Sequence, residues 1–167
     1  MKVCWLSAGV SSFIAGYLMR DTIDKYIYID IDDQHPDSMR FIKDCEKALG
    51  KQVEIIKSNY GSVENVCRQF RVIAFAYVAK CTEVLKKRVR KEWEYEHRDC
   101  DITYVWGFDC TEKNRANRLS DTMIEFSHEY PLIERHLTKQ DCHAMLINLG
   151  IKRPIMYDLG YQNNNCI

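Results

Sequence analysis

The fold is decided by one stretch near the start of the chain, Val3-Cys4-Trp5-Leu6-Ser7-Ala8-Gly9-Val10-Ser11-Ser12-Phe13-Ile14. It opens on a short apolar run, continues with small residues, and is followed by Tyr17 and Leu18, which extend the helical spacing of Phe13 and Ile14. A short, continuously apolar run is typical of a strand that is buried on both of its faces. The stretch therefore predicts a strand, a tight loop and a helix in direct succession.

The same alternation continues along the chain. Tyr26–Ile29 and Val53–Ile56 are predicted strands, and the helix between them begins near Pro36 and ends at Gly50. Ile102–Trp106 is a further predicted strand. Short apolar strands that alternate with amphipathic helices indicate a parallel sheet with right-handed crossovers. We expect an α/β fold of three layers, a Rossmann-like open parallel sheet with helices on both faces.

Apolar residues at helical spacing predict the remaining helices. One helical period runs from Val63 almost to Cys81, and the next helix turns Val84, Leu85, Val89 and Trp93 inward. Another helix is expected over Glu112–Phe126. The last begins at Thr138, which forms an approximate capping box with Asp141, and it stops at Gly150.

The composition is that of a globular protein. Of the 167 residues, 46% are hydrophobic and 29% are charged, and this length predicts a single domain over residues 1–167. The 24 basic and 24 acidic residues cancel, which removes the whole-chain argument for a nucleic-acid or acidic-membrane partner. No signal-peptide pattern or membrane-length apolar run is found, so we expect a cytoplasmic protein without a membrane partner. The eight cysteines form no CxxC pair and are expected to be mostly reduced, buried thiols.

The loop Ser7-Ala8-Gly9-Val10-Ser11-Ser12 is the first candidate for chemistry. Small residues would let backbone N–H groups approach phosphate oxygens, and the helix that follows would add the positive end of its dipole. The loop is neither a GxxxxGK[ST] phosphate loop nor a GxGxxG dinucleotide loop. Serine and glycine are also common in any tight strand-to-helix turn, so the residues alone leave both interpretations open.

The sequence Leu6–Ser12 resembles the pyrophosphate-binding loop (PP-loop) of the adenine nucleotide α-hydrolase superfamily, which includes the N-type ATP pyrophosphatases. The loop's common form is SGGxDS, and the resemblance is strongest to the phosphoadenylyl-sulfate (PAPS) reductase branch. Further segments resemble that branch in the same order. They are Asp30–Asp37, similar to its DTG, spacer and Pro-Glu-Thr stretch; Gly107–Arg115, similar to its Gly-to-Glu-x-x-Arg segment; and Pro131 to Tyr161, similar to its PLI, helix and P-x-Y-x-x-G-Y run.

The resemblance implies a site for an adenine nucleotide, PAPS or ATP. Ser7, Ala8, Gly9, Val10, Ser11 and Ser12 would hold its phosphates, and Asp30 at the end of the second strand would help to position it. Glu112 and Arg115 would belong to the same site, with Arg115 as an anion ligand. The basic stretch Lys86–Lys91 is expected to be a solvated helix face, with contact to a nucleotide phosphate or a nucleic-acid backbone as the alternative.

The chain departs from the family pattern at the loop and at the tail. Ser11 stands where ATP-cleaving members carry aspartate, which weakens the case for ATP pyrophosphate cleavage. The Glu-Cys-Gly motif whose cysteine attacks the sulfonate sulfur in assimilatory PAPS reductases is absent, and Cys166 is its nearest candidate, with Cys81 as a second. Relatives with a similar tail continue into a second cysteine, so we expect this chain to lack a C-terminal extension.

Acidic and cysteine residues are candidates for metal binding. Asp30, Asp32 and Asp33 could bind the Mg²⁺ that accompanies a nucleotide, or they could cap the helix that begins at Pro36. An iron–sulfur site built from Cys81 and Cys166 would need further ligands from Cys110 or a partner subunit, and reduced thiols are the preferred interpretation.

Three functions follow as hypotheses. The first is a PAPS reductase-like enzyme of sulfur metabolism, an oxidoreductase in which the thiolate of Cys166 or Cys81 attacks sulfur and thioredoxin or glutaredoxin supplies the electrons. The second is an ATP pyrophosphatase-type enzyme that adenylates its substrate with Mg²⁺. The third is a nucleotide-binding module without chemistry of its own, working in a nucleic-acid modification or defence system.

Overall fold

The computed structural model of the chain describes residues 1–72 and 80–164. Its centre is a five-stranded sheet in which every pairing is parallel and the strand order is β3-β2-β1-β4-β5. The strands are β1 (Lys2–Leu6), β2 (Lys25–Asp30), β3 (Val53–Lys57), β4 (Thr103–Val105) and β5 (Ser127–Glu129). The α/β fold and its open parallel sheet are thus confirmed.

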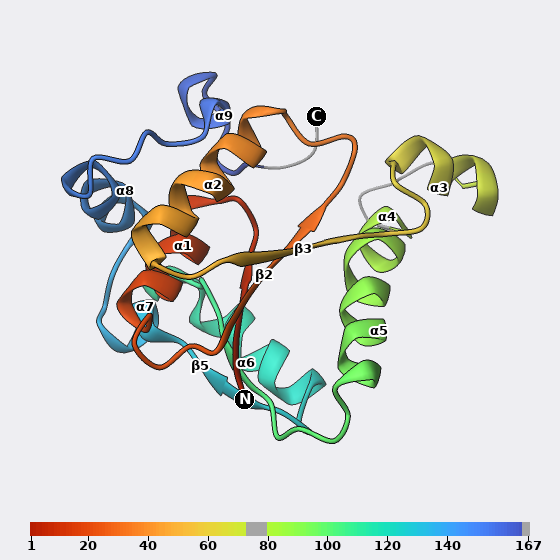
Figure 1. The fold of residues 1–167 in the computed structure, drawn as a ribbon, viewed down its shortest axis with the longest axis horizontal. Helices are drawn as coiled ribbons and strands as arrows, with labels where there is room; N and C mark the ends of the chain where they lie inside the picture. Colours follow the sequence, from red (N-terminus) through yellow and green to blue (C-terminus); the bar gives the residue numbers. More distant parts are fainter. Residues whose placement is uncertain (73–79, 165–167) are drawn as a thin grey trace.

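Helices cover both faces of this sheet (Figure 1). In chain order they are α1 (Val10–Leu18), α2 (Asp37–Leu49), α3 (Val63–Phe70), α4 (Lys80–Thr82), the π-helix η1 (Glu83–Arg88), α5 (Val89–Glu96), the 3₁₀ turn η2 (Cys110–Glu112), α6 (Lys113–Thr122), α7 (Pro131–Glu134), α8 (Lys139–Asn148) and α9 (Ile155–Asp158). Helices α1, α2 and α8 contribute to the core on one face, and α5 and α6 pack on the other. None of the helices in the described ranges combines the length and the apolarity that crossing a membrane requires.

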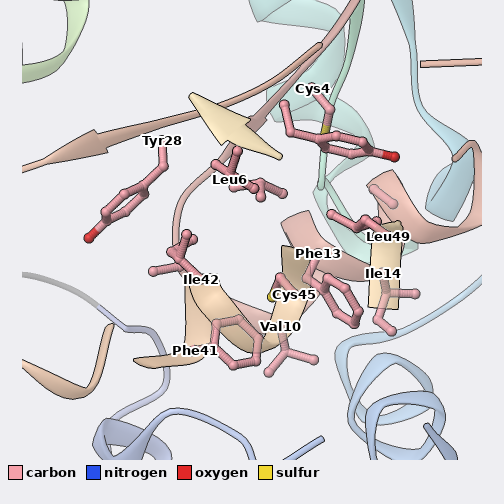
Figure 2. Close-up of a cluster of buried hydrophobic side chains, with 14 of the residues drawn as sticks. Cys4, Leu6, Val10, Phe13, Ile14, Tyr28, Phe41, Ile42, Cys45 and Leu49 are labelled. Carbon is pink, nitrogen blue, oxygen red and sulfur yellow. The ribbon is translucent and has the colours of Figure 1, made fainter. Parts of the chain in front are cut away.

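Strand β1 shows why the central strands are apolar at every position. Cys4 and Leu6 belong to the core under α1 and α2, whereas Val3 and Trp5 pack in the core on the opposite face. Figure 2 shows the first of these cores, in which side chains of the sheet meet those of the two helices. Because successive strand side chains point to opposite faces, a strand that is covered on both sides needs an apolar residue at each step.

The strand order reverses at β1, which pairs with β2 on one side and with β4 on the other. In open α/β sheets, ligands bind outside the carboxyl ends of the strands at such a reversal. The loops that follow β1 and β4 therefore flank the position where this fold places a site.

Several predicted ends and caps are confirmed. Gly50 ends α2 in the left-handed conformation with a φ of 64°. The capping box of Thr138 and Asp141 opens α8, and both of its hydrogen bonds are present. The inward residues predicted for the helix after Cys81 are all buried, namely Val84, Leu85, Val89 and Trp93.

The periodicity left the end of the helix from Val63 open, and one other predicted boundary, at Phe126, is wrong. Helix α3 ends at Phe70 because Arg71 adopts the left-handed conformation, and the later predicted positions Ile73, Ala74, Tyr77 and Val78 lie outside the described residues. Helix α6 ends at Thr122, four residues before the predicted Phe126, because the chain turns at Met123. The side chains of Met123 and Phe126 still pack in the same core.

Two features near the sheet edges were not anticipated correctly. Strand β5 is only three residues long, and its sequence Ser-His-Glu carries no apolar run that would have signalled a strand. Asp33 caps a different helix from the one predicted, since its carboxylate accepts a hydrogen bond of 2.6 Å from the Val63 amide at the start of α3.

Replacing Phe41 tests the importance of the α1–α2 core. Its ring is fully buried and packs edge-on against Phe13, with 5.9 Å between the ring centroids. We expect Phe41→Ala to lower the free energy of unfolding in urea by about 3–5 kcal/mol. Lys43→Ala, at an exposed position of the same helix, should change it by about 0.5 kcal/mol or less. Equal effects of the two substitutions would show that Phe41 does not belong to a packed core.

Candidate functional site

A cleft of about 590 Å³ opens at the carboxyl ends of β1, β2 and β4. The loop after β1 forms one wall, the segment after β4 forms another, and the helix that begins with η1 supplies basic side chains. Of the predicted site residues, the structure brings together Ser7, Gly9, Ser11, Ser12, Glu112 and Arg115 in its lining. Ala8 and Val10 are buried beneath it.

The Ser12 hydroxyl closes the loop between β1 and α1. It donates a hydrogen bond of 2.9 Å to the Gly9 carbonyl and accepts one of 3.0 Å from the Ser7 amide. Its oxygen also lies 3.0 Å from the Ser7 hydroxyl, with which it shares a hydrogen bond. The residue is only 7% exposed. The Ser12 hydroxyl therefore holds the turn.

Three amides at the start of α1 have no hydrogen-bond acceptor among the described residues. Within residues 1–72 and 80–164, nothing accepts a hydrogen bond from the amides of Gly9, Ser11 or Ser12. The first turn of a helix leaves its N–H groups without intrahelical partners, and its dipole favours an anion there. The Val10 amide differs, because it donates to the Tyr157 hydroxyl at 3.3 Å.

Gly107 brings the segment after β4 into direct contact with this turn. A Cβ atom at Gly107 would lie 2.4 Å from the Ser12 Cα and 2.6 Å from the Ser12 amide nitrogen. These are backbone atoms at the start of α1, which cannot move aside as a flexible side chain could. Only glycine allows the two chain segments to approach this closely.

Positive charge dominates the cleft. Its lining includes the basic side chains of Lys86, Lys87, Arg90, Arg115 and Lys139. Among the described residues, Glu112 is the single carboxylate in that lining. A concave surface with this charge imbalance concentrates anions, although the chain as a whole is neutral.

The basic residues differ in how far their charge is compensated. Arg115 lies 2.6 Å from the Glu112 carboxylate, and Arg90 lies 3.1 Å from Glu94. Lys86 and Lys87 form no ion pair with any residue in the described part of the chain. Both belong to the π-helix η1, a geometry that often occurs at functional sites. Their charge is therefore available to an anionic ligand.

The predicted acidic residue Asp30 lies apart from the cleft lining. Its carboxylate forms an ion pair of 2.9 Å with Lys57 on the neighbouring strand β3. Among the described residues, no three histidine, cysteine or acidic side chains are grouped so that they could hold a metal ion. A magnesium site at Asp30 stays a prediction.

The described cysteines lie outside the cleft lining as well. Cys81 packs against the core formed by Ile31 and Val66, and Cys166 lies outside the described residues. Cys142 lies beneath the loop, where burial raises the pKa of its thiol to about 12. That thiol stays protonated near neutral pH and is a poor nucleophile.

The C-terminal segment also forms part of the cleft, through Tyr157, Asn163 and Asn164. It is anchored on the first turn of α2, where the Asp37 carboxylate accepts a hydrogen bond of 2.8 Å from the Ile155 amide. Arg40 binds the same carboxylate through two hydrogen bonds. Sequence reasoning did not assign any of these residues to the site. The signals in the sequence were the resemblance of Pro154–Tyr161, which contains Tyr157, and that of Asp30–Asp37, which contains Asp37; Asn163 and Asn164 had none.

No protein-family model matches this sequence. A search of curated proteins also finds no similar sequence. In three dimensions, the chain is similar to the crystal structure of phosphoadenylyl-sulfate (PAPS) reductase from Candida auris, determined as a phosphate complex. The TM-score is 0.71 at 12% sequence identity, and the match covers 99% of this chain and 80% of that chain. The chain thus has a PAPS reductase-like fold, as the sequence motifs predicted.

Gly107→Ala tests the contact that shapes the cleft. We expect a loss of about 1–3 kcal/mol in the free energy of unfolding, because the added Cβ overlaps the start of α1. Binding of inorganic phosphate, followed by ³¹P NMR, should fall with it. Gly150→Ala is the control: its φ of 68° makes alanine cost about 1–2 kcal/mol, but no atom lies within 4 Å of the added Cβ. If phosphate binding weakens equally in Gly107→Ala and Gly150→Ala, the loss is due to general destabilisation and not to the contact at Gly107.

Asp37 predicts a pH dependence for the anchor of the C-terminal segment. The hydrogen bond from Arg40, supported by the Ile155 amide, holds the pKa of Asp37 below its ordinary value of 3.8. A lowered folded-state pKa stabilises the fold above pH 3.8, and this stabilisation is lost as the pH falls through the folded-state value. The difference in unfolding free energy between wild type and Asp37→Asn should therefore be constant from about pH 7 to pH 5 and shrink below pH 3.8.

Urea unfolding at a series of pH values measures that difference. Asp121→Asn, at an exposed position of α6, serves as the control and should track the wild type throughout. A gap between wild type and Asp37→Asn that stays constant down to pH 2 would contradict the assignment.

Proposed function

We propose that this chain binds an adenine nucleotide in the cleft, with the phosphates at the loop Ser7–Ser12, and acts as a PAPS reductase-like enzyme. The observation that carries the proposal is the coincidence of open amides at the start of α1 with the uncompensated cations of η1 across one cleft. The site lies at the reversal of strand order, where this class of fold binds its ligands. The neighbour of the same fold was crystallised as a phosphate complex.

The ligand would be held chiefly by the backbone. Amides of Gly9, Ser11 and Ser12 would donate to phosphate oxygens, while the Ser12 hydroxyl keeps the loop in shape. Lys86 and Lys87 would supply charge from the opposite wall, and Arg115 would reach the ligand from α6. Trp106 and Phe108 offer apolar surface in the same cleft for the base or sugar.

The sulfur chemistry needs a thiolate that enters this cleft. In the proposed reaction, the thiolate of Cys166 attacks the sulfonate sulfur, a sulfur–sulfur bond forms, and the sulfur–oxygen bond to the nucleotide breaks, with the nucleotide phosphate as leaving group. A thioredoxin- or glutaredoxin-type dithiol then reduces the thiosulfonate and releases sulfite. Buried Cys142 is excluded as the nucleophile by its raised pKa.

A second candidate function is nucleotide binding without chemistry in the chain itself. It is favoured by the cleft lining, which contains no cysteine among the described residues. In that case Cys166 is dispensable, and the nucleotide serves as a bound signal or is passed to a partner, as in a nucleic-acid modification or defence system. If Cys166→Ser releases no sulfite but binds the nucleotide as the wild type does, the chain is an enzyme and not a binding module.

Calorimetric titration of the reduced protein tests the binding site. We expect adenosine 3′,5′-bisphosphate, the nucleotide product of PAPS reduction, to bind more tightly than ATP with Mg²⁺. Lys86→Gln should weaken bisphosphate binding about tenfold, as expected for the loss of one charge-assisted contact. Lys91→Gln is the matched control, because Lys91 is exposed on the adjoining helix α5 and does not line the cleft.

The other outcomes are equally informative. Tighter binding of ATP would favour the ATP pyrophosphatase-type function despite Ser11. An equal effect of Lys86→Gln and Lys91→Gln would place the ligand outside this cleft. If neither nucleotide binds to the wild type, the proposed function is wrong.

A further inference from the structure

The C-terminal segment makes a second, more specific contact with the loop after β1. Asn164 is only 7% exposed, and its side-chain amide nitrogen donates a hydrogen bond of 2.8 Å to the Ala8 carbonyl. The same nitrogen donates one of 2.9 Å to the hydroxyl of Ser38 on α2. Both hydrogens of this amide are therefore used, and the side chain ties the loop to a buried residue of a packed helix.

The orientation of the Asn164 amide is set by its partners. The Ala8 carbonyl can only accept, so the nitrogen and not the oxygen must face it. Turning the amide over would place the Asn164 oxygen against the Ala8 carbonyl oxygen in a buried position, and the hydrogen bond to Ala8 would be lost. The contact thus has a defined direction, from Asn164 to the loop.

This hydrogen bond fixes the peptide that joins Ala8 to Gly9. In a trans peptide, the C=O of one residue and the N–H of the next point in opposite directions. A carbonyl held by Asn164 therefore points the Gly9 N–H in the opposite direction, away from Asn164. That N–H is one of the amides without an acceptor among the described residues, and Gly9 lines the cleft.

The same peptide is free to turn over once the hydrogen bond is removed. A peptide flip changes ψ of the first residue and φ of the second, and glycine accepts either sign of φ at little cost. Gly9 now has a φ of −103°, while Ala8 has a φ of 54° that alanine adopts only under constraint. The flipped peptide would present a carbonyl oxygen where the ligand needs an N–H, and a phosphate would be repelled.

We propose that Asn164 is a positioning residue, which holds the Ala8–Gly9 peptide in the orientation that receives a phosphate. The inference rests on the proposed function, because it assigns a role to Asn164 within the same phosphate site. It also makes phosphate binding depend on the C-terminal segment, which is folded against the loop by a residue 156 positions away in the chain.

The test compares ligands with and without phosphate. In Asn164→Ala, the Kd for adenosine 3′,5′-bisphosphate should rise about five- to tenfold, the effect of losing one oriented hydrogen-bond donor. The Kd for adenosine should stay within about twofold of the wild type, because its contacts do not include the loop amides. Gln162→Ala, at an exposed position of the same segment, is the matched control and should change neither value.

A ligand-free measurement separates this inference from the proposed function. In ¹⁵N-labelled protein, the Gly9 amide resonance should shift in Asn164→Ala and not in Gln162→Ala. If the wild type binds no nucleotide, the proposed function fails, and the Gly9 resonance still reports whether Asn164 holds the peptide. An unshifted Gly9 resonance, or equal losses for bisphosphate and adenosine, overturns the positioning role. Should Asn164→Ala not fold, Ser38→Ala removes only the second partner and should give a smaller loss in the same direction.

Discussion

The backbone contact between Gly107 and the first turn of α1 is the constraint on which the cleft depends. A side chain at this position would overlap Ser12, so the segment after β4 can reach the loop after β1 only because residue 107 has none. Trp106, Phe108 and the start of α6 are then placed at a fixed distance from the amides of α1. The walls of the cleft are thus set by backbone packing, which is more rigid than contacts between long side chains.

The loop itself resolves an ambiguity of the sequence. Small residues after a strand suit either a phosphate site or an ordinary tight turn. Here the two descriptions apply to different atoms of the same residues. The Ser12 hydroxyl closes the turn through Ser7 and Gly9, and the backbone amides of Gly9, Ser11 and Ser12 are left open. Under the proposed function, the loop binds a phosphate through these amides, so a residue that orients their peptides belongs to the proposed site.

The sequence predicted the features that depend on local pattern. The apolar runs of β1, β2 and β3 identified central strands, because burial on both faces leaves a continuous signal. Strand β5 was not predicted, since a three-residue edge strand of polar composition has no such pattern. The cap on α3 from Asp33 and the contacts of Tyr157 and Asn164 with the loop join distant parts of the chain. The periodicity of a sequence carries no information on contacts between distant residues. The family resemblance indicated the C-terminal segment but not its contacts with the loop.

The distribution of charge also depends on the fold and cannot be predicted from the composition. Equal numbers of acidic and basic residues gave no reason to expect an anion site, yet folding gathers basic side chains at one cleft and pairs several acidic ones elsewhere. Asp30 is an instance, because Lys57 neutralises it on the neighbouring strand. Lys86 and Lys87 are the converse, since the π-helix turns them toward the cleft without a carboxylate beside them. Under the proposed function, a ligand with negative charge would complete this arrangement, whereas a neutral ligand would leave the charges of Lys86 and Lys87 without a partner in the cleft. The charge of the ligand is thus the property on which the proposed selectivity depends.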